Sequence, residues 1–177
     1  TYDVFNRRAN CYANYFASQG YKKGDVVALL MENRPEFLIV ATGLSKLGVI
    51  VSLINNGVRK EVLSHALSIC DARALILGHE LLEAYQEIAD QVKMLDPATI
   101  YLEDEGRQLT PPVGMLNINE LLADADDSNP PTTGQVVSDD VIVYIYTSGT
   151  TGFPKATAVT QKRWLVLANL FGLYGSM

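Results

Sequence analysis

Nine consecutive residues in the last quarter of the sequence combine side chains that suit an oxyanion. The segment from Thr147 to Lys155 runs Thr-Ser-Gly-Thr-Thr-Gly-Phe-Pro-Lys, with four hydroxyl side chains, two glycines and one lysine. Glycines let backbone N–H groups turn toward an anion, hydroxyls add donors, and lysine adds a mobile positive charge. This composition predicts a phosphate-binding loop.

The spacing of its glycines and lysine distinguishes this segment from other phosphate-binding loops. It is not a Walker A motif, because Lys155 is not followed by Ser or Thr, which argues against a kinase or GTPase. The alternative is a polar turn between two strands, in which the glycines serve turn geometry only. A turn needs one or two hydroxyl residues, whereas Thr147, Ser148, Thr150 and Thr151 supply four. We therefore favour phosphate binding.

The residues around the loop predict the elements that hold it. Positions 141–146 are β-branched and aromatic, which is typical of a strand. A second strand is expected over 156–160, followed by a helix over 161–174 that Thr160 caps.

Apolar runs and helical periodicity alternate along the preceding chain. Strands are expected over 26–30, 49–54, 74–77 and 99–102, and helices over 2–16, 33–47, 59–70 and 81–92. This alternation predicts an α/β fold, a layered sheet with helices on both faces. Asn33, three residues ahead of Glu36, marks one helix start, and Asn117 with Glu120 marks another, short helix.

Two segments have the composition of loops. Positions 103–115 contain glycines and prolines and should be exposed, and 124–133 is acidic and proline-rich, as in a linker. We therefore expect an α/β subdomain over 1–122, a linker or loop over 123–137, and a strand–loop–strand–helix unit over 138–177.

Metal binding by the aspartates of the 123–137 segment is disfavoured. Asp124, Asp126 and Asp127 lack the glycine and the distal glutamate of a calcium loop, so no metal ligand is predicted. Cys11 and Cys70 are too few for a disulfide framework or a metal cluster, and we expect buried, reduced thiols. His65 lies among apolar residues and is expected to pack in its helix rather than act as a base.

The composition argues against other classes of protein. The 177 residues are 48% hydrophobic and carry a net charge of −6, which argues against disorder and against a nucleic-acid-binding surface. The first residues lack the pattern of a signal peptide, so a cytoplasmic location is expected.

The segment from Tyr144 to Ala156 resembles the signature phosphate loop of the acyl-adenylate-forming, or AMP-binding, enzymes. Positions 24–30 and 33–37 resemble upstream parts of the same family. Positions 52–56 through Arg59, and Ala156 after Pro-Lys, look most like the branch of fatty acid transport proteins and very-long-chain acyl-CoA synthetases.

The resemblance implies an ATP-dependent fatty acid–CoA ligase. A carboxylate would attack the α-phosphate of ATP, assisted by Mg2+, to give acyl-AMP and release pyrophosphate, and the thiol of coenzyme A would then displace AMP from the acyl-AMP. The family role of Thr147, Ser148, Gly149, Thr150, Thr151, Gly152 and Lys155 is to hold the β- and γ-phosphates. Lys155 would act as an electrostatic clamp. Phe153 stands where leucine is frequent in this family, and the resemblance implies that it makes a packing contact.

The resemblance also implies an incomplete unit. The family's adenine, ribose, metal and acyl sites and its small C-terminal domain lie beyond the loop. The chain therefore resembles part of an N-terminal domain that needs the remainder of its own protein and is inactive alone.

Three alternatives stay open at this point. The acid could be a bile acid, a carnitine-like acid or an aryl acid rather than a fatty acid. The protein could instead be a non-catalytic lipid-handling or transport module, or another phosphate-binding α/β protein. Peripheral association with a membrane is compatible with a long-chain acyl substrate.

Overall fold

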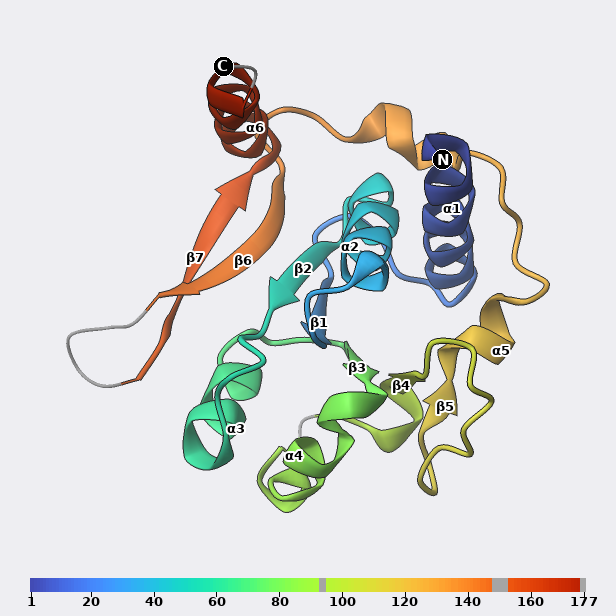
Figure 1. Cartoon of the computed structure of the whole chain (residues 1–177), viewed down its shortest axis with the longest axis vertical. Coiled ribbons are helices and arrows are strands. Elements are labelled where there is room, and N and C mark those ends of the chain that lie inside the picture. Colours follow the sequence, from blue (N-terminus) through green and yellow to red (C-terminus); the bar gives the residue numbers. More distant parts are fainter. Residues whose placement is uncertain (93–94, 148–152, 176–177) are drawn as a thin grey trace.

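The structure, a computed structural model, describes residues 1–92, 95–147 and 153–175. Its described part contains one sheet of seven strands in the order β5-β4-β3-β1-β2-β6-β7 (Figure 1). The strands are β1 (Val26–Leu30), β2 (Ile50–Leu53), β3 (Ala74–Gly78), β4 (Ile100–Glu103), β5 (Leu116–Asn117), β6 (Val141–Thr147) and β7 (Lys155–Thr160).

Strands β1 to β6 pair in parallel, and β7 runs antiparallel to β6. All five residues of β1 and of β3 are buried, which explains why their sequences are unbroken apolar runs. The carboxyl ends of β1 to β6 therefore share one edge of the sheet, and β6 leads from that edge into the predicted phosphate loop.

The principal helices cover both faces of this sheet. The covering helices are α1 (Tyr2–Ser18), α2 (Pro35–Lys46), α3 (Lys60–Ser68), α4 (Leu82–Gln86) and α5 (Ile118–Leu122), and a further helix, α6 (Gln161–Gly175), follows β7. One apolar core joins α1, α2 and α5 to the sheet, and a second joins α3 and α4 to its other face. The predicted α/β fold, with helices on both faces, is confirmed.

Helices α1 and α2 pack closely because of one glycine. A Cβ atom at Gly43 of α2 would lie 2.4 Å from the carbonyl oxygen of Ala9 in α1. Real side chains do not tolerate that distance, so the contact between the two backbones requires glycine here.

Several expectations from the sequence are wrong in detail. The helix over 81–92 is broken into a short 3-10 turn (His79–Leu81), α4, and a second 3-10 turn (Ala89–Gln91). Asn33 does not cap α2, whose N-cap is Arg34, with no side-chain cap bond. Asn117 does cap α5, accepting from the backbone N–H groups of Asn119 and Glu120.

Two burial predictions also need correction. Cys70 is buried as expected, but Cys11 is only half-buried; neither forms a disulfide. The segment 103–115 is largely exposed, yet its first two residues, Glu103 and Asp104, are fully buried. Glu103 pairs with Arg34, and Asp104 accepts hydrogen bonds from Gly106, Leu109 and Asn117.

The acidic, proline-rich segment lies against α1 rather than free in solvent. Asn14 donates from Nδ2 to the carbonyl oxygens of Asp126 (2.7 Å) and Ser128 (2.9 Å), and Asn10 donates to that of Asp127 (2.8 Å). Asn6, Asn10 and Asn14 are spaced four residues apart and so share one face of the helix. We call residues 125–129 the α1 strap.

Candidate functional site

The β6–β7 hairpin places the two described ends of the predicted loop face to face. Thr147 pairs with Lys155 in the antiparallel register, and Tyr146 pairs with Ala156. Side chains of directly opposite residues in such a pair lie on the same face of the hairpin. Thr147 and Lys155, both exposed, are therefore brought together at the mouth of the loop.

The other predicted phosphate ligands, Ser148, Gly149, Thr150, Thr151 and Gly152, lie outside the described residues. The structure confirms the two strands that were expected on either side of these residues, over 141–146 and 156–160. Helix α6 follows at Gln161, and Thr160 caps it as predicted, because its hydroxyl accepts from the backbone N–H of Arg163 at 3.3 Å.

The hairpin leaves the sheet at the edge where ligands bind in open α/β proteins. Val51 of β2 pairs with Val143 of β6, and Leu53 pairs with Ile145, so β6 continues the parallel sheet. Ligands of such sheets bind outside the carboxyl ends of the strands. The predicted loop therefore begins at a position suited to ligand binding.

The first arm of the hairpin is fixed by the hydroxyl of Tyr146. It donates to the carbonyl oxygen of Ala66 in α3 at 2.9 Å, and it lies 2.8 Å from the Oγ of Ser52. Because the single phenolic proton goes to the carbonyl, the Ser52 hydroxyl is the donor in the second bond. Burial raises the pKa of Tyr146, which keeps the phenol protonated and able to donate.

The second arm meets the same helix. The ring of Phe153 lies over that of His65, with centroids 4.7 Å apart and planes tilted by 42°. Phe153 is thus a packing contact, as predicted, and His65 packs against the arm of the loop from its place in α3. Sequence reasoning placed each residue correctly in its element but missed their contact.

A small cavity of about 170 Å³ separates α3 from the mouth of the hairpin. Its walls are Asn55, Val58, Val62, Ala66, Tyr146, Thr147 and Pro154. The lining is mostly apolar, so the cavity borders the predicted phosphate site without supplying charge to it.

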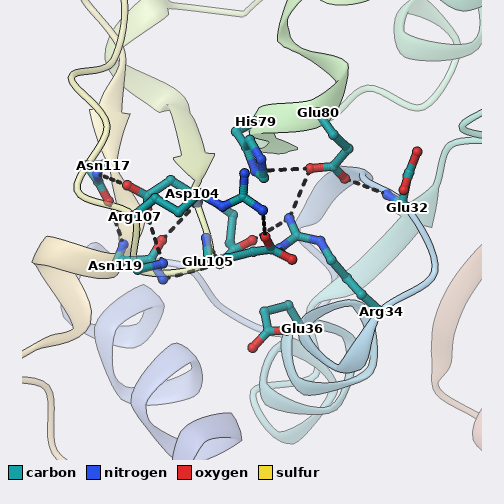
Figure 2. Close-up of polar contacts among 12 residues, drawn as sticks. Glu32, Arg34, Glu36, His79, Glu80, Asp104, Glu105, Arg107, Asn117 and Asn119 are labelled. Atoms are coloured by element: carbon teal, nitrogen blue, oxygen red, sulfur yellow. Dashed lines mark hydrogen bonds and ion pairs between the residues drawn. The ribbon is translucent and has the colours of Figure 1, made fainter.

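A charged cluster occupies the same edge of the sheet, nearer β1, β3 and β4 (Figure 2). The guanidinium of Arg34 lies 3.2 Å from Oε2 of Glu80 and 3.3 Å from Oε1 of Glu105, and it also pairs with Glu103. Arg34 has a side chain only 11% exposed, and that of Glu103 is 0% exposed. We call these four residues the Arg34 cluster.

The Arg34 cluster lies where the strand order reverses. The chain passes from β1 to β2 on one side and returns to β3 on the other, so Arg34 and Glu80 follow two strands that flank this switch point. Glu80 also accepts from the backbone N–H of Glu32 at 2.7 Å and lies 3.3 Å from Nδ1 of His79. The cluster ties the three loops after β1, β3 and β4 together.

Asp104 anchors the loop that follows β4. Burial alone would raise the pKa of its carboxyl group, but hydrogen bonds from the Asn117 side chain and from the backbone N–H groups of Leu109 and Gly106 outweigh burial and lower it. The carboxylate is therefore charged and fully bonded. Among the residues described, no group of three or more His, Cys, Asp and Glu side chains forms a metal-binding geometry.

Sequence reasoning missed the Arg34 cluster. The available signal was the presence of charged residues directly after three apolar strands, at Arg34, Glu80 and Glu103. Arg34 falls within the helix predicted over 33–47, and Glu103 falls within the segment 103–115 that was expected to be exposed.

Together, the fold and the site consist of a mainly parallel sheet with helices on both faces and a glycine- and hydroxyl-rich hairpin at its carboxyl edge. The chain belongs to the AMP-binding enzyme family, whose model matches residues 1–175. This confirms the resemblance recognised in the loop sequence.

Curated relatives place the chain within that family. It is 35% identical over 164 residues to the human long-chain fatty acid transport protein 6, and 34% identical over 175 residues to the medium/long-chain-fatty-acid–CoA ligase FadD6 of Mycobacterium tuberculosis. These matches cover 91% and 99% of this chain but only 26% and 27% of the relatives. The chain thus spans about a quarter of the length of these proteins.

Solved structures share the fold. The anthranilate CoA ligase AuaEII, solved with anthranoyl-AMP, superposes with a TM-score of 0.83 at 27% identity, covering 96% of this chain and 31% of that one. The N-terminal domain of FACL13 from Mycobacterium tuberculosis superposes with a TM-score of 0.75 at 30% identity, covering 91% and 37%. Within the described residues, no helix has both the length and the apolar character needed to cross a bilayer.

Proposed function

We propose that this chain carries the ATP phosphate-binding part of a fatty acid–CoA ligase that works through an acyl-AMP intermediate. The observation that carries the proposal is the pairing of Thr147 with Lys155 at the mouth of a glycine-rich loop, at the carboxyl edge of the sheet. Family membership supports it, as do the relative named as a fatty acid–CoA ligase and the neighbour solved with an acyl-AMP.

In this proposal the loop holds charge and does no proton transfer. The hydroxyls and backbone N–H groups of 147–152 bind the β- and γ-phosphates, and Lys155 compensates the charge that builds up as the carboxylate attacks the α-phosphate. ATP enters as its magnesium complex, and coenzyme A is the second substrate. The adenine, ribose, acyl and coenzyme A contacts are proposed to come from parts of the protein beyond this chain.

A fatty acid is the proposed carboxylate. Several relatives are named long-chain fatty acid transport proteins and one is named a medium/long-chain-fatty-acid ligase, which favours a long aliphatic chain over an aryl acid. The neighbour named as an anthranilate ligase keeps the aryl acid as the second candidate. We also propose a cytoplasmic location with peripheral membrane association, supported by the names of the transport relatives.

We propose the organisation expected from the sequence as well. Residues 1–122 form an α/β subdomain, 123–137 a linker or loop, and 138–177 the unit that carries the phosphate loop. The contacts of the α1 strap support a linker that is held in place on the first subdomain.

The test separates the two half-reactions in the full-length protein. Lys155→Ala should slow fatty-acid-dependent exchange between ATP and pyrophosphate by about 100-fold or more, the usual effect of losing one preorganised donor. Thioester formation from supplied acyl-AMP should change far less. Lys162→Ala, which removes an exposed lysine from α6, is the matched control. Equal slowing of both steps by Lys155→Ala would contradict the role of the loop.

A further inference from the structure

We propose that helix α3 positions the phosphate loop, with His65 and Tyr146 as positioning residues that hold its two arms; this inference rests on the proposed function of the loop. Both arms of the β6–β7 hairpin contact the same helix, and they do so at adjacent positions, His65 and Ala66. One rigid element thus sets the placement of both ends of the loop.

The contact with the first arm is polar and directional. The Tyr146 hydroxyl donates to a backbone carbonyl of α3, that of Ala66, and accepts from Ser52, which is fully buried in β2. Tyr146 immediately precedes Thr147, the first residue of the predicted loop. The position of Thr147 is therefore set by a hydrogen bond to α3 and another to the sheet.

The contact with the second arm is aromatic. Phe153 is 44% exposed, so its ring is not held by a surrounding core, and the ring of His65 is the aromatic partner that it contacts. Phe153 lies two residues ahead of Lys155, separated only by Pro154, whose ring limits backbone freedom. A restraint on Phe153 is therefore transmitted to Lys155.

The space between the two contacts is not filled. The cavity of about 170 Å³ lies between α3 and the hairpin, bounded by Val62 and Ala66 on one side and by Pro154 on the other. Because packing is incomplete there, the polar contact of Tyr146 and the ring contact of His65 are the attachments on either side of it. Losing one should loosen the arm that it holds without opening the core.

A loop whose arms are loose must be ordered each time that ATP binds. Preorganised groups avoid this cost, so the effect should appear in binding of the nucleotide more than in the rate of the bound complex. We expect His65→Ala to raise the KM for ATP in the exchange reaction by up to about tenfold, the range of one aromatic pair. The kcat should change by less than about twofold.

The decisive experiment is a double-variant cycle in the full-length protein. His65→Ala and Phe153→Ala should each raise the KM for ATP, and the double variant should be no worse than the more affected single one, because both remove the same contact. His65→Phe, which keeps a ring at this position, should restore the KM to within about twofold of wild type. Ser68→Ala, an exposed position on the same helix, is the matched control and should have no effect.

A measurement that does not depend on catalytic activity accompanies the kinetic measurements. In the nucleotide-free protein, His65→Ala should speed hydrogen exchange of the backbone amides at Thr147 and Lys155 and leave those of β1 and β3 unchanged. Additive effects on KM, a His65→Phe variant as impaired as His65→Ala, or unchanged exchange at the hairpin mouth would overturn the proposal. If wild type catalyses no ATP–pyrophosphate exchange, the proposed function fails, whereas the hydrogen-exchange comparison still tests the positioning by α3.

Discussion

The hydroxyl groups of Ser52 and Tyr146 lie 2.8 Å apart although their residues are 94 positions apart in the sequence. This bond joins Ser52 of β2 to the residue that precedes the proposed phosphate loop, and Tyr146 extends the connection to the carbonyl of Ala66. The strand that carries the loop is thus fixed to the sheet and to α3 by one phenol.

Replacing this phenol should lower stability. Tyr146→Phe leaves the Ser52 hydroxyl and the Ala66 carbonyl without their partner, and an unsatisfied buried polar group costs about 1–3 kcal/mol. Urea unfolding should show a loss of that size. Tyr144→Phe removes a hydroxyl two residues earlier on the same face of β6 and should cost less than about 0.5 kcal/mol. Equal losses in the two variants would contradict the role assigned to the Tyr146 hydroxyl.

The Arg34 cluster should be important for stability. Arg34→Ala leaves Glu103 fully buried without its cation, and breaking a buried pair in this way costs about 3–5 kcal/mol. Arg107 pairs with Glu105 at the surface, with its own side chain 56% exposed. Arg107→Ala is therefore the matched control and should cost less than about 1 kcal/mol. Equal losses of thermal stability in the two variants would show that the cluster does not hold the loops together.

The attachment of the α1 strap should be measurable by proteolysis. Asn14→Ala removes the hydrogen bonds to the carbonyl oxygens of Asp126 and Ser128, which should cost about 1–2 kcal/mol and free the backbone of the strap. Cleavage within 125–129 should accelerate, whereas Asn33→Ala, an exposed asparagine after β1, should leave the rate unchanged. An unchanged cleavage rate in Asn14→Ala would mean that these bonds do not restrain the strap.

Asp104 should contribute to the acid sensitivity of the fold. Its pKa is lower in the folded protein than in the unfolded chain, where an aspartate has a value of about 3.9. The carboxylate therefore stabilises the fold above about pH 4, and this contribution is lost as the pH falls through the folded pKa. Urea unfolding from pH 6 to pH 3 should show a smaller acid loss for Asp104→Asn than for wild type. Identical pH profiles would refute the prediction.

The sequence was sufficient to predict those helices and strands whose local residue pattern agrees with their surroundings in the fold. The unbroken apolar run at 26–30 is predicted because both faces of a central parallel strand are buried. The strand over 141–146 is predicted by its β-branched and aromatic residues, although only Ile142 and Val143 are buried in it. The prediction of a single helix over 81–92 is wrong because the spacing of apolar residues does not reveal where the chain turns. Ile88 and Val92 are buried, but the chain turns after Gln86 to bring them there.

Part of the candidate site could be predicted from the sequence, and part could not. The loop residues are contiguous, so their combination of glycine, hydroxyl and lysine is visible in the sequence, and the structure adds the pairing of Thr147 with Lys155. The Arg34 cluster joins residues from three strand ends, with Arg34 and Glu80 separated by 46 positions. Such contacts depend on the strand order, which local composition does not determine.

The central claim is that residues 147–155 bind the phosphates of ATP. The most direct test is an amide NMR titration of this chain with magnesium ATP and, separately, with pyrophosphate, comparing wild type with Lys155→Ala. We predict shifts that are concentrated at the hairpin mouth, at Thr147 and Lys155, and that are lost in the variant. Shifts centred instead on the Arg34 cluster, or none in folded samples of both this chain and the full-length protein, would contradict the claim.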